Sequence, residues 1–124
     1  MARAARTKLG FWLMTGSRHA LEIASLAGFD VVIFDMEPGS IDDGAADALI
    51  PFAKGLGLGV QVRVAAADRV PIQKALDAGA DGVIIPQIRD LDHARRVGAF
   101  AKFPPLGTRG LGFSRIDGYG RRAK

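Results

Sequence analysis

The strongest constraint on the fold is a pattern in which a short apolar segment is followed by a helix-like segment, four times in succession. The apolar segments are "GFWLMT" (10–15), "DVVIFD" (30–35), "GVQVRV" (59–64) and "GVIIPQI" (82–88). Each is the length of a strand and is apolar at neighbouring positions, which is typical of strands buried on both faces of a parallel sheet. The pattern predicts an α/β fold.

The segments between the strands are predicted to be helices over about residues 18–27, 43–55, 69–78 and 90–102. Ser17 is an N-cap residue for the first helix, and Asp42 or Asp43 opens the second. Gly28 is the C-terminal stop of the first helix. Pro71 falls in the first turn of the third helix, where its missing N–H does no harm.

Strands that alternate with helices pair in parallel, with the helices packed outside the sheet. Four consecutive βα units fit either a small doubly wound sheet or half of a (β/α)₈ barrel, which takes about 250 residues when complete. We expect residues 1–124 to form a single domain, with the four units followed by a C-terminal loop over residues 103–124.

Composition excludes several kinds of site. The chain has no cysteine, so disulfides, a thiolate nucleophile and a Cys-based zinc site are excluded. Only His19 and His93 occur, which excludes a histidine-rich metal centre, and we expect both to lie on the surface.

The net charge of +4 comes from six basic residues near the two ends, and without them the charge is 4 − 6 = −2. These six are Arg3, Arg6, Lys8, Arg121, Arg122 and Lys124. Because no aromatic stacking residues are interleaved with them, we expect no nucleic-acid partner.

The apolar runs are shorter than the roughly 20 residues of a membrane span. The first residues do not resemble a signal peptide. The expectation is a cytoplasmic protein without a membrane partner.

Polar residues stand where the predicted strands end, and function gathers at that edge of a parallel sheet. Asp35 and Glu37 end the second strand, Arg63 ends the third, and Pro86 and Gln87 end the fourth. We interpret this set of two carboxylates, one arginine and one amide as a candidate site. The alternative is that Asp35 only caps the following helix while Arg63 pairs with Glu37.

Five segments, in order from about Gly10 to Gly120, carry a resemblance to a known family. They are "GFWLMTGS", "AGFDVVIFDMEPG", "VQVRV", "IQKALDAGADGVIIPQI" and "KFPPLGTRGLGFSRIDGYG". Together they resemble the N-terminal half of the HpcH/HpaI aldolases, relatives of citrate lyase β subunits. The resemblance implies a partial (β/α)₈ TIM-barrel domain and a class II pyruvate aldolase that uses Mg²⁺, Mn²⁺ or Co²⁺. It implies cleavage of 4-hydroxy-2-oxo acids, such as 4-hydroxy-2-oxoheptanedioate or 2-dehydro-3-deoxyglucarate, to pyruvate and an aldehyde.

The resemblance also implies roles for individual residues. Arg63 matches the arginine that contacts the keto oxygen and the developing enolate. Asp77 matches the aspartate that partners a catalytic histidine, although from its position alone it is a solvent-exposed residue at a helix end. Asp35 and Glu37 match an acidic pair that orients water and metal, and we place Gln87 beside them as a substrate-binding or supporting residue.

Two departures from the family pattern bear on activity. The family reads Asp-x-Glu-His-Gly at the turn after the second strand, and here its histidine, the general base, is replaced by Pro38. The family's metal ligands, a glutamate and an aspartate from the fifth and sixth strands, lie beyond Lys124. We therefore predict no metal ligand within these residues and weak or no aldolase activity for the isolated chain.

Exposed edge strands of a half-barrel predict a homo-oligomer or a complementary half-barrel as partner. The alternative function is a non-catalytic truncated or split-gene module that assembles in the same way. A weaker alternative is an anion site in "PPLGTRGLG" (104–112), where Arg109 and backbone amides could hold a phosphate, although a flexible loop also fits this segment. We interpret "GLGLG" (55–59) as a helix stop and tight turn, and Trp12 as buried core.

Overall fold

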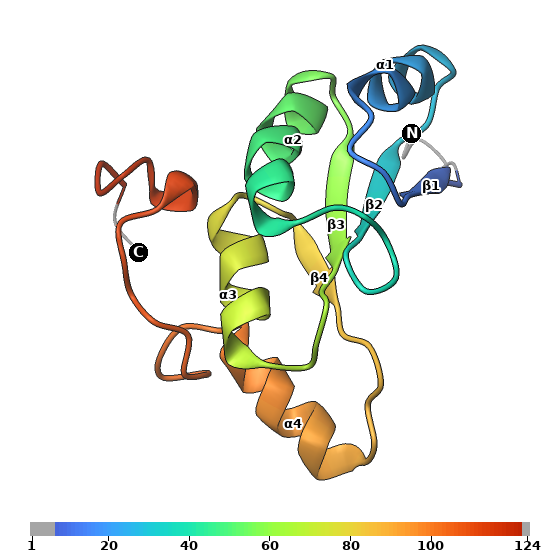
Figure 1. The fold of residues 1–124 in the computed structure, drawn as a ribbon. Coiled ribbons are helices and arrows are strands. Elements are labelled where there is room, and N and C mark those ends of the chain that lie inside the picture. Colours follow the sequence, from blue (N-terminus) through green and yellow to red (C-terminus); the bar gives the residue numbers. More distant parts are fainter. Residues whose placement is uncertain (1–6, 123–124) are drawn as a thin grey trace, which may run out of the picture.

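The computed structural model describes residues 7–122, in which four strands alternate with four helices (Figure 1). In chain order these are β1 (Gly10–Leu13), α1 (Arg18–Leu26), β2 (Val31–Asp35), α2 (Asp43–Gly55), β3 (Gly59–Arg63), α3 (Arg69–Asp77), β4 (Gly82–Ile84) and α4 (Leu91–Phe100), followed by a 3₁₀ helix, η1 (Arg115–Asp117). The predicted α/β fold is confirmed. None of the helices described is long and apolar enough to span a membrane.

The strands form one parallel sheet in the order β1-β2-β3-β4. Because crossover connections are right-handed, a strand order that always advances in one direction places successive helices on the same side of the sheet. Contacts between α1 and α2, α2 and α3, and α3 and α4 agree with this arrangement. It is the arrangement of consecutive barrel units, whereas a doubly wound sheet has helices on both sides.

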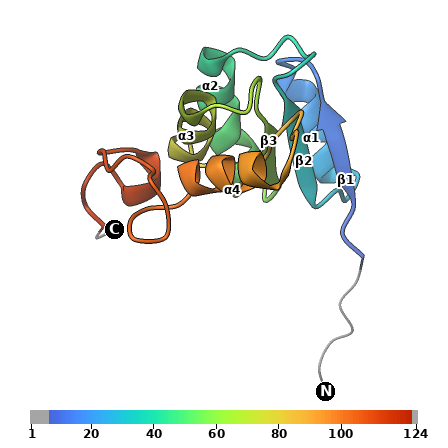
Figure 2. The same cartoon turned by 90° about the horizontal axis from the view of Figure 1, so that it is seen from below.

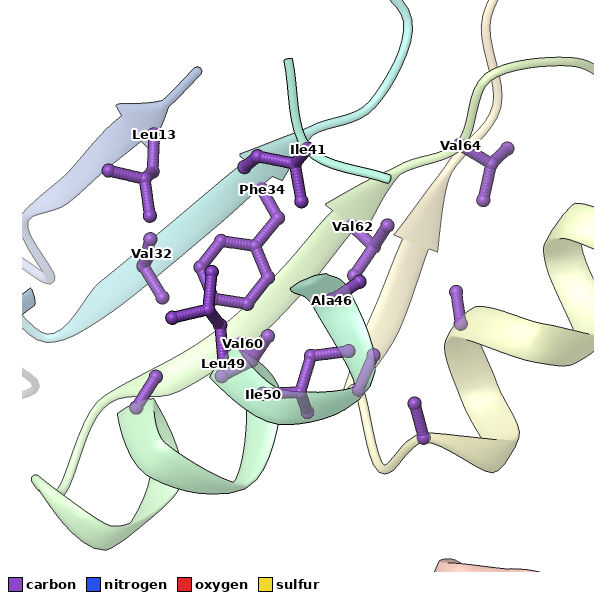
Figure 3. Packing of buried hydrophobic residues seen from close by; sticks show 14 of the residues in the cluster. Leu13, Val32, Phe34, Ile41, Ala46, Leu49, Ile50, Val60, Val62 and Val64 are labelled. Carbon is purple, nitrogen blue, oxygen red and sulfur yellow. The ribbon is translucent and has the colours of Figure 1, made fainter. Parts of the chain in front are cut away.

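The hydrophobic core lies between the sheet and the helices. Phe34, Val60 and Val62 point to the helical side of the sheet and are fully buried. Figure 3 shows Phe34 next to Leu49 of α2, and Ile50 lies on the same helix. This packing fixes which face of each strand points toward the helices.

The opposite face of the sheet carries a different set of side chains. In the register of the sheet, Trp12 lies opposite Ile33, and Ile33 lies opposite Gln61. Trp12 is 51% exposed, so the prediction that it is buried core is wrong. The reason is the alternation of side chains along a strand. Leu13 points into the core, and its neighbour Trp12 therefore points to the other face.

α1 and α2 begin at predicted capping residues, and α1 stops before the predicted glycine. Ser17 Oγ accepts the N–H of Ala20, and an Asp42 carboxylate oxygen accepts the N–H of Ala45. Gly28, after α1, has a φ of 86°, in the left-handed region that favours glycine. Pro71 lies in the first turn of α3. The "GLGLG" segment closes α2 and turns at Gly57, which has a φ of 83°, as predicted.

All four strands are shorter than predicted, β2 and β3 by one residue each and β1 and β4 by more. β1 ends at Leu13 rather than at residue 15, and β4 ends at Ile84 rather than at residue 88. Pro86 has no N–H for a ladder bond. Gln87 has a φ of 53°, which is incompatible with a strand. The apolar run therefore continues into a loop that leaves the sheet.

The C-terminal segment, residues 103–122, lies beside α3 on the side away from β1 (Figure 2). Arg115 attaches it to two helices, because its Nη1 donates to the carbonyl of Asp47 at 2.9 Å and to the carbonyl of Ala78 at 3.0 Å. Pro51 lies inside α2 and has no N–H to donate to the carbonyl four residues earlier, which is that of Asp47. Arg115 supplies the missing donor.

We predict that Arg115→Leu lowers the free energy of unfolding by about 1 to 2 kcal/mol, because two carbonyls lose a donor. Urea unfolding measures the change. Arg95→Leu is the matched control, since Arg95 is 69% exposed and, among residues 7–122, forms an ion pair with Asp92 alone. This control should change stability by less than about 0.5 kcal/mol.

The contribution of Pro51 is tested by making Arg115→Leu in a Pro51→Ala variant and measuring the free energy of unfolding again. In Pro51→Ala the N–H of residue 51 bonds the carbonyl of Asp47, so Arg115→Leu should cost less there than in the wild type. An equal cost in the two backgrounds would contradict this role of Arg115.

Candidate functional site

Asp35 and Arg63 form the centre of the candidate site. They are the last residues of β2 and β3 and are directly paired in the register of the sheet. Arg63 donates through Nε to Asp35 Oδ1 at 2.9 Å and through Nη2 to Asp35 Oδ2 at 2.5 Å. The Asp35 side chain is 3% exposed and the Arg63 side chain 28% exposed. The buried carboxylate therefore holds a partly exposed guanidinium in a fixed orientation.

Trp12 lies against the same guanidinium. The Arg63 guanidinium carbon is 4.9 Å from the centroid of the Trp12 ring, a cation–π contact. This contact gives the exposed tryptophan a specific partner at the carboxyl edge of the sheet.

Glu37 and Gln87 complete the group of polar residues. Glu37 Oε2 is 3.2 Å from Arg63 Nη1, and Gln87 Nε2 donates to Glu37 Oε1 at 2.9 Å. Asp35, Glu37, Arg63 and Gln87 thus meet at one edge of the sheet, and we call them the rim cluster. The alternative to a site was that Asp35 only caps the following helix while Arg63 pairs with Glu37. The pairing of Arg63 with Glu37 is present. However, Asp42 rather than Asp35 caps α2.

Asp35 and Arg63 are the strongly coupled charged pair of the rim cluster. The hydrogen bond from Arg63 lowers the pKa of Asp35 below its usual range, and burial of the carboxyl acts in the opposite direction. The same hydrogen bond raises the pKa of Arg63. The two groups therefore remain an ion pair at neutral pH.

Asp77 is not brought to the rim cluster. It is the last residue of α3, and the chain enters β4 at Gly82 shortly afterwards, so it lies toward the edge where strands begin. Its Oδ1 accepts from Arg109 Nη2 at 2.5 Å. Arg109 is buried and also contacts the ring of Phe103. The arginine of the 104–112 segment is therefore paired with a carboxylate of this chain.

The turn after β2 is tightly constrained at Gly39 and open at Pro38. A Cβ at residue 39 would overlap the carbonyl oxygen of Asp35, so only glycine fits. Pro38 is exposed and has no group that accepts or donates a proton.

The two histidines, His19 and His93, differ in how exposed they are. His19 is exposed on α1, as predicted. His93 is 7% exposed in the first turn of α4, so the prediction that it lies on the surface is wrong. Its backbone N–H donates to Asp90 Oδ1 at 2.7 Å, and its Nδ1 accepts the N–H of Arg89 at 3.3 Å. The first of these bonds is the main cause of a lowered pKa at Asp90. The sequence signal was Asp90 three residues before His93, which places the histidine in a capped first turn beside the loop.

His93 lines a cleft of about 320 Å³ between the loop that follows β3 and the loop that follows β4. The remaining lining residues are Ala65, Ala66, Ala67, Asp68, Pro86, Gln87 and Arg89. Gln87 belongs to both the cleft and the rim cluster. The cleft therefore adjoins Glu37 through one shared residue.

A larger cavity, of about 450 Å³, lies between α2, α3 and the C-terminal segment. Its basic residues, Lys74 and Arg115, are held in ion pairs with Asp43 at 2.6 Å and with Asp47 at 3.1 Å. It also includes Asp77.

The described residues do not by themselves fit a divalent metal ion. Residues 7–122 contain no group of three or more histidines or carboxylates placed to hold one. Both oxygens of Asp35 are already bonded to Arg63.

Comparison with known proteins identifies the family and agrees with the fold. The family model "HpcH/HpaI aldolase/citrate lyase" matches residues 8–119, and the chain belongs to this family. It is 33% identical to a 2-dehydro-3,6-dideoxy-6-sulfogluconate aldolase of Pseudomonas putida, over 99% of this chain and 51% of the relative. It is also 33% identical to a 4-hydroxy-2-oxovalerate aldolase of Rhodococcus jostii, over 94% of this chain and 45% of the relative.

Solved structures show the same relation. The crystal structure of an HpcH/HpaI aldolase from Desulfitobacterium hafniense matches with a TM-score of 0.83 and 32% identity, over 92% of this chain and 44% of that one. The citrate synthase SbnG matches with a TM-score of 0.79 and 29% identity, over 84% of this chain and 42% of that one. The chain spans about half the length of the relatives it matches, and its four βα units correspond to half of a TIM-barrel-like aldolase.

We predict that Asp35→Asn destabilises the protein more at neutral than at acid pH. In an unfolded chain an aspartate titrates near pH 3.9. Because the folded-state pKa is lower, the ionised carboxylate contributes stability above that value, and the contribution is lost as the pH falls through the folded-state pKa. The difference in free energy of unfolding from the wild type should therefore be larger at about pH 7 than at about pH 3, as measured by urea unfolding.

Ser40→Ala is the control in the same turn. Its hydroxyl donates to the carbonyl of Met14 and does not titrate in this range, so its effect should be equal at the two pH values. A pH-independent effect of Asp35→Asn would refute the ion-pair explanation.

Proposed function

We propose that this chain supplies the enolate-binding half of a barrel that cleaves small 4-hydroxy-2-oxo acids to pyruvate and an aldehyde. The observation that carries the proposal is the Arg63 guanidinium, held by buried Asp35 at the carboxyl edge of the sheet and partly exposed there. Membership of the HpcH/HpaI aldolase family supports the reaction class.

The reaction explains why a fixed cation is needed. Breaking the bond between C3 and C4 leaves its electron pair on the pyruvate part, as an enolate whose negative charge is on the C2 oxygen. A preorganised guanidinium stabilises this charge without having to reorient. Asp35 fixes the orientation of Arg63, and Trp12 covers one face of it. Glu37 is the neighbour with which an incoming substrate oxygen competes for Nη1.

Cleavage also requires a base for the proton of the 4-hydroxyl group. In the family the base is the histidine that follows the acidic pair, and here Pro38 offers no proton-accepting group. Asp77, proposed as its partner, lies at the far end of α3, bonded to Arg109. We therefore propose that proton removal, rather than enolate stabilisation, is the impaired part of the site.

The family is generally one of metal-dependent class II aldolases. Because residues 7–122 do not fit a metal by themselves, we propose that Mg²⁺, Mn²⁺ or Co²⁺ would be held by carboxylates of the remaining strands of the barrel. Within the described sheet, β1 and β4 each pair with only one strand. A complementary half-barrel or a second copy of this chain is therefore the proposed partner.

A second candidate is a non-catalytic module that assembles with itself or with a complementary half. Two observations favour it, because Pro38 replaces the base and Arg63 is already bonded to two carboxylates. In this case the rim cluster only ties β2, β3 and the loop after β4 together. A mass measurement by size exclusion separates the candidates, since a metal-dependent oligomer favours a surviving site and a metal-indifferent species favours the module.

We predict that the 124 residues alone release pyruvate from 4-hydroxy-2-oxo acids only at background rates with Mn²⁺ or Mg²⁺. A chimera that joins residues 1–119 to the remaining strands of the Pseudomonas putida relative should release it measurably. In that chimera Arg63→Gln should lower kcat/KM about 100-fold or more, because it removes the oxyanion-stabilising cation. Arg95→Gln, on the exposed face of α4, is the control and should leave the rate unchanged.

Clear turnover by the 124 residues alone that Arg63→Gln abolishes would show that the missing strands are not required. A chimera in which Arg63→Gln and Arg95→Gln behave alike would instead support the non-catalytic module.

We predict that Pro38→His raises the kcat of the same chimera at least about tenfold, since it restores a proton-accepting group beside Glu37. Residue 38 is exposed, so the new side chain needs no rearrangement of the core. Pro38→Asn is the control that adds a polar side chain without a base. Equal rates for the two variants would contradict the assignment of the base.

A further inference from the structure

Within the rim cluster, Glu37 lies beside the guanidinium nitrogen of Arg63 that Asp35 does not use. Asp35 accepts from Nε and Nη2, whereas Glu37 Oε2 lies 3.2 Å from Nη1. The Arg63 side chain is 28% exposed and the Glu37 side chain 24% exposed. The nitrogen that Asp35 leaves to other partners is therefore already paired with a carboxylate that solvent reaches.

The charges of the rim cluster oppose the binding of an anion. Asp35 and Glu37 are carboxylates and Arg63 is a cation, so the three groups carry a net charge of −1. A 2-oxo acid is itself an anion at neutral pH, so Glu37 both repels it and competes with it for Nη1. Asp35 is 3% exposed and gives Arg63 two bonds, which leaves Glu37 as the carboxylate that can move aside.

Gln87 holds Glu37 in the position beside Arg63. Its Nε2 donates to Glu37 Oε1 at 2.9 Å, so one carboxylate oxygen is bonded to the loop after β4 while the other faces Arg63. Gln87 has a φ of 53°, in the left-handed region that costs a non-glycine residue conformational energy. Pro86, directly before it, is buried and anchors this part of the loop. A strained residue that persists next to a site is a sign of a functional constraint.

We propose that Gln87 is a positioning residue that holds Glu37 beside Arg63 and thereby weakens the binding of small carboxylates at the site. A 2-oxo acid binds by displacing Glu37 from Nη1, and this movement also breaks the hydrogen bond between Gln87 and Glu37. The proposal rests on the proposed function, which places the pyruvate half at Arg63. The displacement exchanges ion pairs and hydrogen bonds, and it makes or breaks no covalent bond.

The experiment measures binding of oxalate, a small planar dicarboxylate, to the 124-residue chain in metal-free buffer. The readout is the fluorescence of Trp12, which is the only tryptophan and lies 4.9 Å from the Arg63 guanidinium carbon. Glu37→Gln should bind oxalate about tenfold more tightly than the wild type, because the competing carboxylate is gone. Arg63→Gln should give no saturable response, since it removes the cation.

The role of Gln87 is tested with a variant of similar length that lacks the N–H donor. Gln87→Met should tighten oxalate binding about threefold, because Glu37 is no longer held. In a Glu37→Gln background the same change should alter binding by less than about 1.5-fold, since there is no carboxylate to hold. This dependence on Glu37 separates a positioning role from a general effect on the loop. Gln73→Met, on α3 and outside the rim cluster, is the matched control and should leave binding unchanged.

Three results would overturn the proposal: equal oxalate affinity in the wild type and folded Glu37→Gln, no saturable response in folded Glu37→Gln, and an equal effect of Gln87→Met with and without Glu37. Circular dichroism reports whether each variant is folded. The aldolase proposal fails separately, through an Arg63→Gln chimera that still releases pyruvate. Tighter oxalate binding by Glu37→Gln and Gln87→Met together with that failure would establish the control of an anion site and reject the enolate role of Arg63.

Discussion

The candidate site depends on the register between β2 and β3. Phe34 and Val62 are paired neighbours on the helical side of the sheet and are fully buried, and the next residue on each strand, Asp35 and Arg63, points to the other face. A slip of one residue in either strand would turn its charged side chain into the core and its core residue out of it. The energy that fixes the ion pair thus comes mainly from apolar packing around Phe34 (Figure 3). The hydrogen bonds between the two side chains only choose the orientation within that register.

The helices pack on one face of the sheet, so the side chains on its other face are not covered by these helices. Right-handed crossovers place the helices on one side, so the strands alternate between a core face and a face that in a closed barrel points inward. The exposed Trp12 and the half-buried Ile33 and Gln61 belong to that second face. Its polar groups are concentrated at the carboxyl edge, where Arg63 lies over Trp12. Family relatives about twice as long as this chain are consistent with an inner face that other strands would cover.

Local signals predicted most of the fold, and long-range contacts account for what the sequence did not predict. Ser17, Asp42 and Gly28 act through bonds or dihedral angles within a few residues, so the helix ends were predictable from residue type. The partner of Arg63 was left open because Asp35 and Glu37 both fit the pattern, and only the register decides that Asp35 receives the two parallel bonds. Trp12 and His93 were misplaced for a related reason, since burial depends on which face or loop is covered by distant segments. The contact of Arg115 with the carbonyl of Asp47 links residues far apart in sequence and leaves no local signature.

In the turn after β2, the contacts that set the shape of the turn do not involve the side chain of residue 38. The shape of the turn is set by the N–H of Met36 on the carbonyl of Arg63, by the N–H of Ser40 on the carbonyl of Met14, and by the lack of room for a side chain at Gly39. None of these constraints involves the side chain of residue 38, which is exposed. Proline at this position therefore removes a proton-accepting group without removing any contact that holds Asp35 and Arg63 together. The ion pair is supported from the core side, whereas residue 38 stands on the solvent side, so under the proposed function the substrate-binding residues do not depend on the residue at the position of the base.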